Sequence, residues 1–390
     1  MSYGSRVTDE KAPEERASLV ELRAEIDRVD RQVLELLAQR MHIVTQVGRY
    51  KRNENVGIRD PKRERQMLEA RRALAIELGL DPGPIESIYR QIVLASRDYQ
   101  AALEVSAAPQ TDPKRVCIVG GAGAMGGLFR KLFHDLGHHV EIADLNTAHK
   151  AGELAGEADV VMISVPIAVT EEVIREVGPR LRPDALLMDI TSIKAAPLAA
   201  MLGSTEASVI GTHPMFGPGV HSLLGQRVVV CRGRGDAWHD WLIHTFRARG
   251  LVLSEAGPEE HDRAMALVQV LTHFQTQVFG LALARTGVPL EQSLRFTSPA
   301  YLMELYVAAR HFAQAPDLYG PIEMRNPSTA LVTAEFRRAA QELSEILETR
   351  DQARFEAAFR EVRQFFGVFA EEAIEQSSFL IDRLVERAVG

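Results

Sequence analysis

The chain has 390 residues, of which 46% are hydrophobic and 25% charged, and its formal net charge is −8 at pH 7. This length predicts two or three domains, and the negative charge argues against a general nucleic-acid binder. The sequence contains no apolar run of about eighteen residues that would predict a membrane span. Residues 1–18 also lack the apolar segment of a secretory signal, so we expect a disordered leader there.

Three helices are predicted in the first hundred residues. Apolar residues recur at helical spacing over residues 19–53, a second helix is expected over 61–78, and a third over 84–103. The first helix, of about nine turns, is too long to bury its apolar side alone, so it is expected to need a partner chain. Residues 19–100 carry fifteen basic and thirteen acidic side chains, a local excess that suits a small anionic ligand.

The pattern changes after a linker expected over residues 104–113, which contains SAAPQTDP. Seven short β-branched runs with intervening helical stretches span residues 114–257, which predicts an α/β, Rossmann-like domain with a mostly parallel sheet. Cys117 and Cys231 lie inside two of these runs, so we expect buried thiols, no disulfide or zinc site, and a reducing cytoplasm. Residues 258–390 are again helical, so the chain is predicted to be multidomain, with all-α first and third domains.

A glycine-rich turn follows the first predicted strand. Gly121, Gly123 and Gly126 form G-x-G-x-x-G before a helical stretch, and this arrangement lets a pyrophosphate approach the helix N-terminus. The second strand ends at Asp144, eighteen residues past Gly126. A carboxylate there binds ribose hydroxyls and repels a 2′-phosphate, which favours NAD over NADP; otherwise Asp144 only caps the next helix. The predicted cofactor-binding residues are Gly121, Gly123, Ala124, Met125, Gly126, Asp144, Ser164, Val165 and Pro166.

A rigid segment, GTHPMFGPG at residues 211–219, places His213 at the end of a predicted strand. Ser192 and Lys194 follow the preceding strand, so all three residues are expected at the sheet edge where ligands bind. A histidine fixed there can accept a hydroxyl proton while hydride leaves the same carbon. The alternative is a turn in which the histidine only packs.

Longer motifs carry a specific resemblance. IVGGAGAMG, SVPIAVTEEVI, GTHPMFGPG, EEHDRAMALVQVLTHF and SPAYLMELYVAARHFAQAPDLY closely resemble the prephenate dehydrogenases, and the N-terminal helices resemble the AroQ-type chorismate mutases. Their order resembles the bifunctional family of bacterial tyrosine biosynthesis, over about residues 19–385. The resemblance implies an isomerase that converts chorismate to prephenate, and an NAD-dependent oxidoreductase that converts prephenate to 4-hydroxyphenylpyruvate. It also implies a homodimer, formed through the C-terminal helices, and feedback inhibition by L-tyrosine.

The resemblance assigns roles in the dehydrogenase site. His213 matches the catalytic histidine, and Ser192 matches the serine that orients the substrate hydroxyl and this histidine. Arg310 matches the arginine that binds a substrate carboxylate, for which a planar guanidinium is suited. His273 is expected to hold the pyruvyl side chain, and Asp262 to orient Arg310.

Other positions match less fully. Lys194 matches a lysine of the family site, but no distinct role follows. Leu302 stands where some relatives carry a second arginine, and Gln269 stands where some have a small hydroxyl residue, so affinity or side-chain selectivity is expected to differ. Five other histidines show no motif and are expected on the surface or in packing, at positions 134, 138, 139, 239 and 244.

A pericyclic rearrangement needs no covalent intermediate with the protein. It needs a substrate dianion held in a folded conformation and hydrogen-bond donors to an ether oxygen that gains negative charge. The resemblance places eight residues in that site: Arg23, Arg40, Lys51, Asp60, Arg63, Glu64, Ser96 and Gln100. In role, Arg23 and Arg40 would bind carboxylates, while Lys51 and Gln100 would donate to the ether oxygen. Glu64 would accept from the ring hydroxyl, and Arg63 would buttress the loop.

Helical geometry bears on these positions independently. Arg40 and Lys51 are eleven residues apart and share a helix face, as do Ser96 and Gln100, which are four apart. Arg23 lies seventeen residues before Arg40, roughly 100° out of phase, so a dimer partner is expected to supply it. Because Gln100 is neutral, acid pH should not be needed.

Three alternatives stay open. Arogenate differs from prephenate only in its side chain, so the same fold could be an arogenate dehydrogenase. A β-hydroxyacid dehydrogenase would leave the mutase residues unexplained. A non-catalytic dimeric coiled coil fused to a nucleotide-sensing domain would not place Arg40 and Lys51 facing inward, so their burial discriminates.

Overall fold

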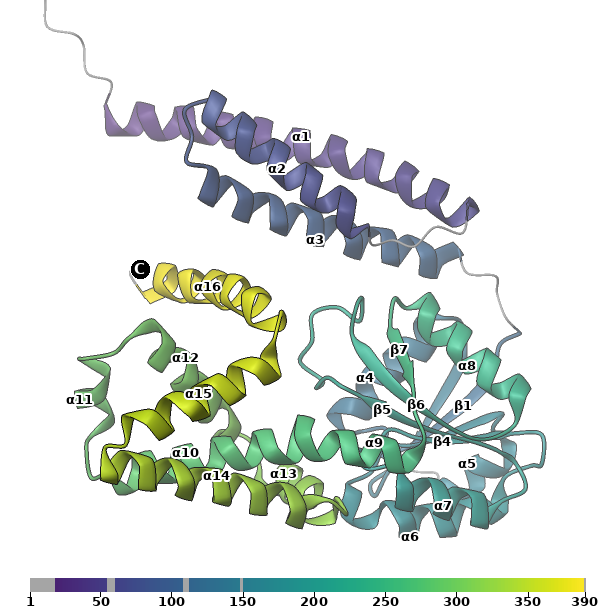
Figure 1. Ribbon diagram of the computed structural model, residues 1–390. Coiled ribbons are helices and arrows are strands. Elements are labelled where there is room, and N and C mark those ends of the chain that lie inside the picture. Colours follow the sequence, from purple (N-terminus) through teal and green to yellow (C-terminus); the bar gives the residue numbers. More distant parts are fainter. Residues whose placement is uncertain (1–17, 55–59, 108–111, 148–149, 389–390) are drawn as a thin grey trace, which may run out of the picture. The chain divides into compact units, whose positions relative to one another are not determined.

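A computed structural model of the chain describes residues 18–54, 60–107, 112–147 and 150–388 (Figure 1). The chain forms two compact units, Met1–Ala108 and Pro109–Gly390. The predicted leader lies outside the described residues except for Ser18, and so does the part of the predicted linker at 108–111.

The first unit contains the three predicted helices, α1 (Leu19–Asn53), α2 (Pro61–Glu77) and α3 (Pro82–Ala107). Asp60 caps α2 by accepting a hydrogen bond of 2.9 Å from the Arg63 backbone, and the third helix continues past residue 103, where the sequence predicted its end. Among the described residues of this unit, Val44 and Ala75 are the only buried apolar ones. The apolar side of α1 therefore stays open to solvent within one chain.

The second unit begins with a seven-stranded sheet of order β2-β1-β3-β4-β5-β6-β7. All neighbouring strands are parallel except β5 and β6, which confirms the mostly parallel sheet. The strands are β1 (Arg115–Val119), β2 (His139–Ala143), β3 (Val160–Ile163), β4 (Leu186–Asp189), β5 (Ser208–Pro214), β6 (Arg227–Arg234) and β7 (Val252–Glu255).

Helices cover both faces of this sheet (Figure 1). Alternate residues of each strand point to opposite faces, so Val116 and Ile118 pack against α4 and α8, while Cys117 and Val119 pack against α5, α6 and α7. Both cysteines are buried and free, as predicted. The covering helices are α4 (Ala124–Asp135), α5 (Ala151–Glu157), α6 (Ile167–Val177), the 3₁₀ turn η1 (Gly178–Arg180), α7 (Ala195–Ser204) and α8 (Asp236–Ala248).

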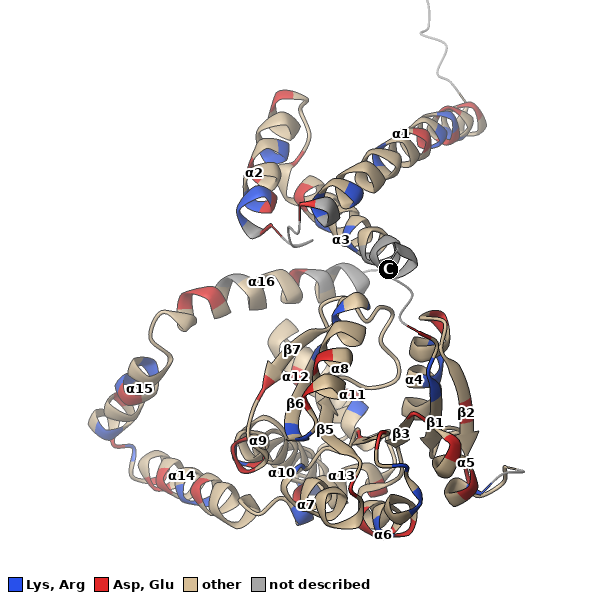
Figure 2. Cartoon of the chain, turned by 90° about the vertical axis from the view of Figure 1, so that its right-hand side faces the viewer, with Lys and Arg blue, Asp and Glu red and all other residues tan. Residues whose placement is uncertain are grey.

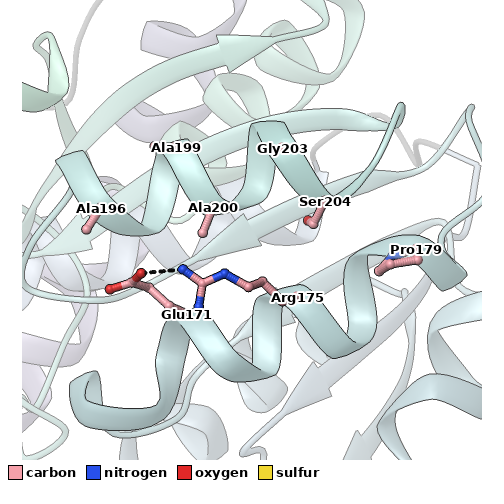
Figure 3. A pocket seen from close by; sticks show the side chains of 8 residues that line it. All are labelled: Glu171, Arg175, Pro179, Ala196, Ala199, Ala200, Gly203 and Ser204. Carbon is pink, nitrogen blue, oxygen red and sulfur yellow. Dashed lines mark hydrogen bonds and ion pairs between the residues drawn. The ribbon is translucent and has the colours of Figure 1, made fainter.

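Small residues on α7 leave a surface groove between α6 and α7 (Figure 3). Glu171 and Arg175 of α6 form an ion pair of 2.7 Å, and they lie opposite Ala196 and Ala200 of α7. The residues that line this groove include none of the predicted site residues. The groove is therefore part of the helix packing and not of the predicted sites.

The rest of the second unit is helical. It comprises α9 (Pro258–Met265), the π-helical η2 (Ala266–Leu271), α10 (Thr272–Arg285), α11 (Leu290–Leu294), α12 (Pro299–Phe312), α13 (Pro316–Arg325), α14 (Thr329–Thr349), α15 (Gln352–Phe366) and α16 (Phe369–Ala388). The cartoon in Figure 2 is coloured for both acidic and basic residues along α14 and α15. Large apolar side chains on the same two helices are also exposed, and Phe365 is 84% exposed. No described helix is long and apolar enough to cross a membrane.

Candidate functional site

The turn after β1 brings backbone close to the end of β3. Gly120 has φ +84°, and a Cβ atom there would lie 2.3 Å from the Ser164 carbonyl oxygen. Cβ atoms at Gly121 and Gly126 would lie 2.4 and 2.5 Å from neighbouring atoms. Only glycine fits at these positions, and α4 begins directly after Gly123. The absence of side chains in this turn thus leaves room for a phosphate to approach the N-terminus of α4.

Asp144 lies beside this turn, directly after β2. Its carboxylate accepts hydrogen bonds of 3.1 Å from the Ala122 backbone and 2.8 Å from the Leu145 backbone. Because α5 begins only at Ala151, the interpretation that Asp144 merely caps the next helix is wrong. The other predicted cofactor residues are Ala124 and Met125 in the first turn of α4, and Ser164, Val165 and Pro166 between β3 and α6.

His213 lies within β5, where it pairs with Val229 of β6. The side chain is buried; its Nδ1 is 2.9 Å from His261 Nε2, and its Nε2 is 3.3 Å from Gln269 Nε2. Burial, followed by the nearby His261 and Lys194, lowers the pKa of His213 well below its ordinary value. The imidazole is therefore neutral near pH 7, which is the state that a proton acceptor needs.

Asp262 has a different role from the predicted one. Its carboxylate accepts hydrogen bonds from the backbones of Lys194 (2.8 Å) and Ala195 (3.0 Å), and from the His261 ring (2.8 Å). It therefore fixes the start of α7 and the His261 ring, and its described bonds do not include Arg310. His261 was not predicted as a site residue, although it is adjacent to Asp262 in the EEHD motif.

Lys194 also differs from the prediction. It is completely buried, and its ammonium lies 2.5 Å from Asp189 Oδ2 and 2.6 Å from the Thr212 carbonyl. This pairing ties the loop after β4 to β5, so Lys194 braces the site and does not face a ligand. Ser192 is half-buried in the same loop, between β4 and α7.

His273 and Arg310 belong to the helical part of this unit. The His273 ring packs against Tyr319 and His311, with ring centroids 4.9 and 5.4 Å apart, and its Nδ1 lies 3.9 Å from Glu323. Burial and the neighbouring His311 lower the pKa of His273 to about 4. Arg310 is exposed on α12. None of the described hydrogen bonds joins either residue to His213. The three neighbours of His273 were not predicted as site residues.

The first unit contains a cavity of about 480 Å³ between α1, α2 and α3. Seven of the eight predicted mutase residues line it. They are Arg40, Lys51, Asp60, Arg63, Glu64, Ser96 and Gln100. Arg23 is exposed on α1 and does not line this cavity.

Positive charge faces inward in this cavity. Arg40 donates a hydrogen bond of 2.5 Å to the Ser96 hydroxyl, and Ser96 and Gln100 are buried. Burial lowers the pKa of Arg40, and the nearby Arg71 also lowers it. Arg40 and Lys51 are both half-buried at the cavity wall, an arrangement that a plain coiled coil does not explain.

Glu64 is held by a residue that the sequence analysis missed. Arg97 of α3 donates to both carboxylate oxygens of Glu64, with 2.8 Å between Arg97 Nε and Glu64 Oε1. This bidentate pair fixes the carboxylate at the cavity wall. Arg71 and Tyr89 also line the cavity, and Arg71 could have been found because it lies two turns after Glu64.

Three family models match successive segments of the chain. Residues 22–101 match the model described as chorismate mutase type II. Residues 134–238 match the prephenate dehydrogenase nucleotide-binding domain, and residues 257–361 match the prephenate dehydrogenase dimerization domain.

Two relatives match nearly the whole length of the chain. The chain is 39% identical over 367 residues to the T-protein of Enterobacter agglomerans, covering 94% of this chain and 97% of the relative. It is 35% identical over 366 residues to the T-protein of Haemophilus influenzae, with the same coverage. The crystal structure of prephenate dehydrogenase from Aquifex aeolicus in complex with hydroxyphenyl propionate and NAD⁺ has a TM-score of 0.51 and 19% identity, covering 65% of this chain and 98% of that chain. That likeness supports the fold of the second unit.

Proposed function

The chain belongs to the T-protein family, and on this premise we propose which of its residues perform its two reactions. It rearranges chorismate to prephenate, and it then oxidises and decarboxylates prephenate to 4-hydroxyphenylpyruvate with NAD. The first reaction takes place in the helical unit and the second in the unit that contains the sheet. The observation that carries this assignment is the lining of one cavity by seven predicted mutase residues. In the other unit, His213 is buried in β5 of the same sheet whose strand β1 leads into the glycine-rich turn.

The glycine turn and Asp144 hold NAD. Side chains are absent where the pyrophosphate approaches, and the Asp144 carboxylate is fixed at the edge of the turn by Ala122 and Leu145. This carboxylate accepts hydrogen bonds from ribose hydroxyls and repels a 2′-phosphate. When bound there, NAD would supply the acceptor for the hydride that leaves the substrate ring carbon.

His213 is the general base of the dehydrogenase. Its Nε2 takes the proton from the hydroxyl on the ring carbon that is oxidised, so this oxygen becomes a carbonyl. The ring carboxylate then leaves as carbon dioxide, and its bonding electrons pass into the ring, which becomes aromatic. The oxygen regains a proton and is the phenol of the product. Ser192 orients the hydroxyl and His213.

Residues in the helical part of the second unit contact a carboxylate and the pyruvyl side chain of the substrate. Arg310 binds a substrate carboxylate as a bidentate cation, and His273 holds the pyruvyl side chain. Lys194 and Asp262 hold the loop after β4, the start of α7 and the His261 ring in place. Leu302 offers no cation where some relatives have arginine, so Arg310 carries more of the carboxylate binding here.

The mutase holds chorismate folded between cationic and amide donors. Arg40 binds one carboxylate, and Lys51 and Gln100 donate to the ether oxygen as its negative charge grows. Glu64, oriented by Arg97, accepts from the ring hydroxyl. Arg63 and Asp60 fix the loop before α2, and Ser96 holds Arg40 in place.

We further propose a homodimer in which the partner supplies Arg23. The exposed apolar side of α1 supports this, since Val29 and Val33 are 48% and 49% exposed. The exposed aromatic side chains of α15 and α16, and the match to a dimerization domain, support a second contact through the C-terminal helices. L-tyrosine, which resembles the dehydrogenase product, inhibits by occupying the dehydrogenase pocket. The buried thiols Cys117 and Cys231 fit a cytoplasmic enzyme.

Substrate and cofactor competition tests these assignments. The purified chain is assayed for reduced cofactor with prephenate or arogenate, each with NAD⁺ or NADP⁺, and then with L-tyrosine added. We expect reduction with prephenate and NAD⁺, inhibited by tyrosine. Activity with arogenate alone would retain the fold and the His213 chemistry but replace the substrate. Preference for NADP⁺ would refute the role of Asp144.

A further inference from the structure

Four buried or half-buried side chains form a continuous series of hydrogen bonds that includes His213 of the dehydrogenase site. Asp262 Oδ1 lies 2.8 Å from His261 Nδ1, and His261 Nε2 lies 2.9 Å from His213 Nδ1. The far nitrogen of His213 then contacts Gln269 at 3.3 Å. His213, His261 and Asp262 are 2%, 1% and 2% exposed. Water therefore has little access to any of these three groups.

Backbone hydrogen bonds hold the Asp262 carboxylate in place as a hydrogen-bond acceptor. The carboxylate accepts hydrogen bonds from the backbone N–H groups of Lys194 and Ala195 at the start of α7. The backbone carbonyl of Asp262 accepts a hydrogen bond of 2.8 Å from the Asn326 side-chain amide. Burial alone would raise the pKa of Asp262, but the hydrogen bonds that its carboxylate accepts from His261, Ala195 and Lys194 lower it below its ordinary value. Asp262 is thus ionised at neutral pH and can only accept.

The direction of each hydrogen bond in this series follows from the ionised Asp262 carboxylate. Because Asp262 can only accept, His261 carries its proton on Nδ1, and a neutral His261 has its lone pair on Nε2. His213 then donates from Nδ1 to His261, so its own lone pair lies on Nε2. Gln269, placed by the π-helical η2, offers an amide N–H to that lone pair.

We propose that His261 and Asp262 are positioning residues for the dehydrogenase, which hold His213 in the tautomer whose lone pair lies on Nε2. This rests on the proposed role of His213 as the base. After His213 takes the substrate proton at Nε2, its Nδ1–H still donates to His261, and the Asp262 carboxylate stabilises the new positive charge through that ring. The substrate hydroxyl takes the place of the Gln269 amide at Nε2.

Three substitutions of His261 test the proposal. His261→Leu removes the acceptor, and His261→Asn is too short to reach His213 from the same backbone. In His261→Gln, the side-chain oxygen lies where Nε2 was, so it can still accept from His213. We expect kcat with prephenate to fall about 10²-fold in the Leu and Asn variants. The Gln variant should stay within about tenfold of the parent, and KM for prephenate and NAD⁺ should change little.

Controls separate positioning from folding. The mutase activity of each variant should be unchanged, because that site belongs to the other compact unit. His244→Leu, at an exposed histidine of α8, should leave both activities intact. In the parent protein, ¹⁵N NMR of the histidine rings should show the His213 proton on Nδ1, with the resonance assigned by its loss in His213→Asn. In the His261→Leu variant this proton should move to Nε2.

Three outcomes overturn the proposal or its premise. A folded His261→Leu variant with unchanged kcat would refute the positioning role while leaving His213 as the base. A proton on Nε2 of His213 in the parent would refute it even if no His261 variant folds. An active His213→Asn variant would instead refute the proposed base itself.

Discussion

The buried pair Lys194–Asp189 allows a quantitative prediction about stability. Both side chains are fully buried, and the ammonium lies 2.5 Å from Asp189 Oδ2. Asp189 Oδ2 also accepts from the Thr191 backbone at 3.0 Å, while Oδ1 has no hydrogen-bond partner. The Lys194→Met substitution therefore leaves a buried carboxylate without its countercharge.

The expected cost follows from the burial. Removing one partner of a buried ion pair costs about 3–5 kcal/mol, whereas removing both charges is often close to neutral. We therefore expect Lys194→Met to lower the free energy of unfolding of the second unit by about 3–5 kcal/mol. The double variant with Asp189→Asn should recover all but about 1–2 kcal/mol.

Urea unfolding followed by tryptophan fluorescence measures this cost. The chain has two tryptophans, Trp238 and Trp241, and both lie in α8, so the signal reports the second unit. Lys131→Met is the matched control, since it breaks an exposed pair with Asp135 that is worth about 0–1 kcal/mol. A loss under about 1 kcal/mol in Lys194→Met, or a double variant no more stable than the single one, would refute the reasoning.

Three further predictions concern activity. Replacing Asp144 by serine should raise the KM for NAD⁺ and reduce the preference over NADP⁺ by at least about tenfold, and unchanged cofactor kinetics would exclude the carboxylate from ribose binding. The pKa of His213 is well below its ordinary value and the neutral ring is the active form, so kcat/KM for prephenate should stay level from pH 8 to about pH 6.5. It should decline only as more acidic pH protonates His213, and a decline that begins above pH 7 would contradict this. The Arg23→Ala and Arg40→Ala variants should each lose mutase activity, and a refolded equal mixture should regain about a quarter of it because half of the dimers would have one complete site. No recovery in a mixture shown to contain mixed dimers would contradict the partner's role.

Much of the fold could be predicted because its signals are local. Buried parallel strands are short β-branched runs, and the Val116–Val119 stretch contributes to both faces of the sheet. The antiparallel pairing of β6 could not be predicted, because strand direction depends on how the chain returns and not on composition. The end of α3 was also missed, since no strong breaker precedes Ala107.

The candidate sites divide in the same way. The glycine spacing and the helical spacing of Arg40 and Lys51 are visible in sequence, and the structure gathers those residues as expected. The structural role of Lys194 was missed because its second acceptor, the Thr212 carbonyl, approaches it only once β4 and β5 are paired. His261 was adjacent to a predicted residue, yet its link to His213 spans 48 residues.

The assay of both reactions in sequence tests the central claim most directly. The purified chain, its Arg40→Ala variant and its His213→Asn variant are each given NAD⁺ with chorismate or with prephenate, and NADH is followed. We predict NADH from both substrates with the parent, NADH from prephenate alone with Arg40→Ala, and prephenate accumulation without NADH when His213→Asn receives chorismate. NADH from neither substrate with the parent, or equal NADH from chorismate with all three proteins, would contradict the account.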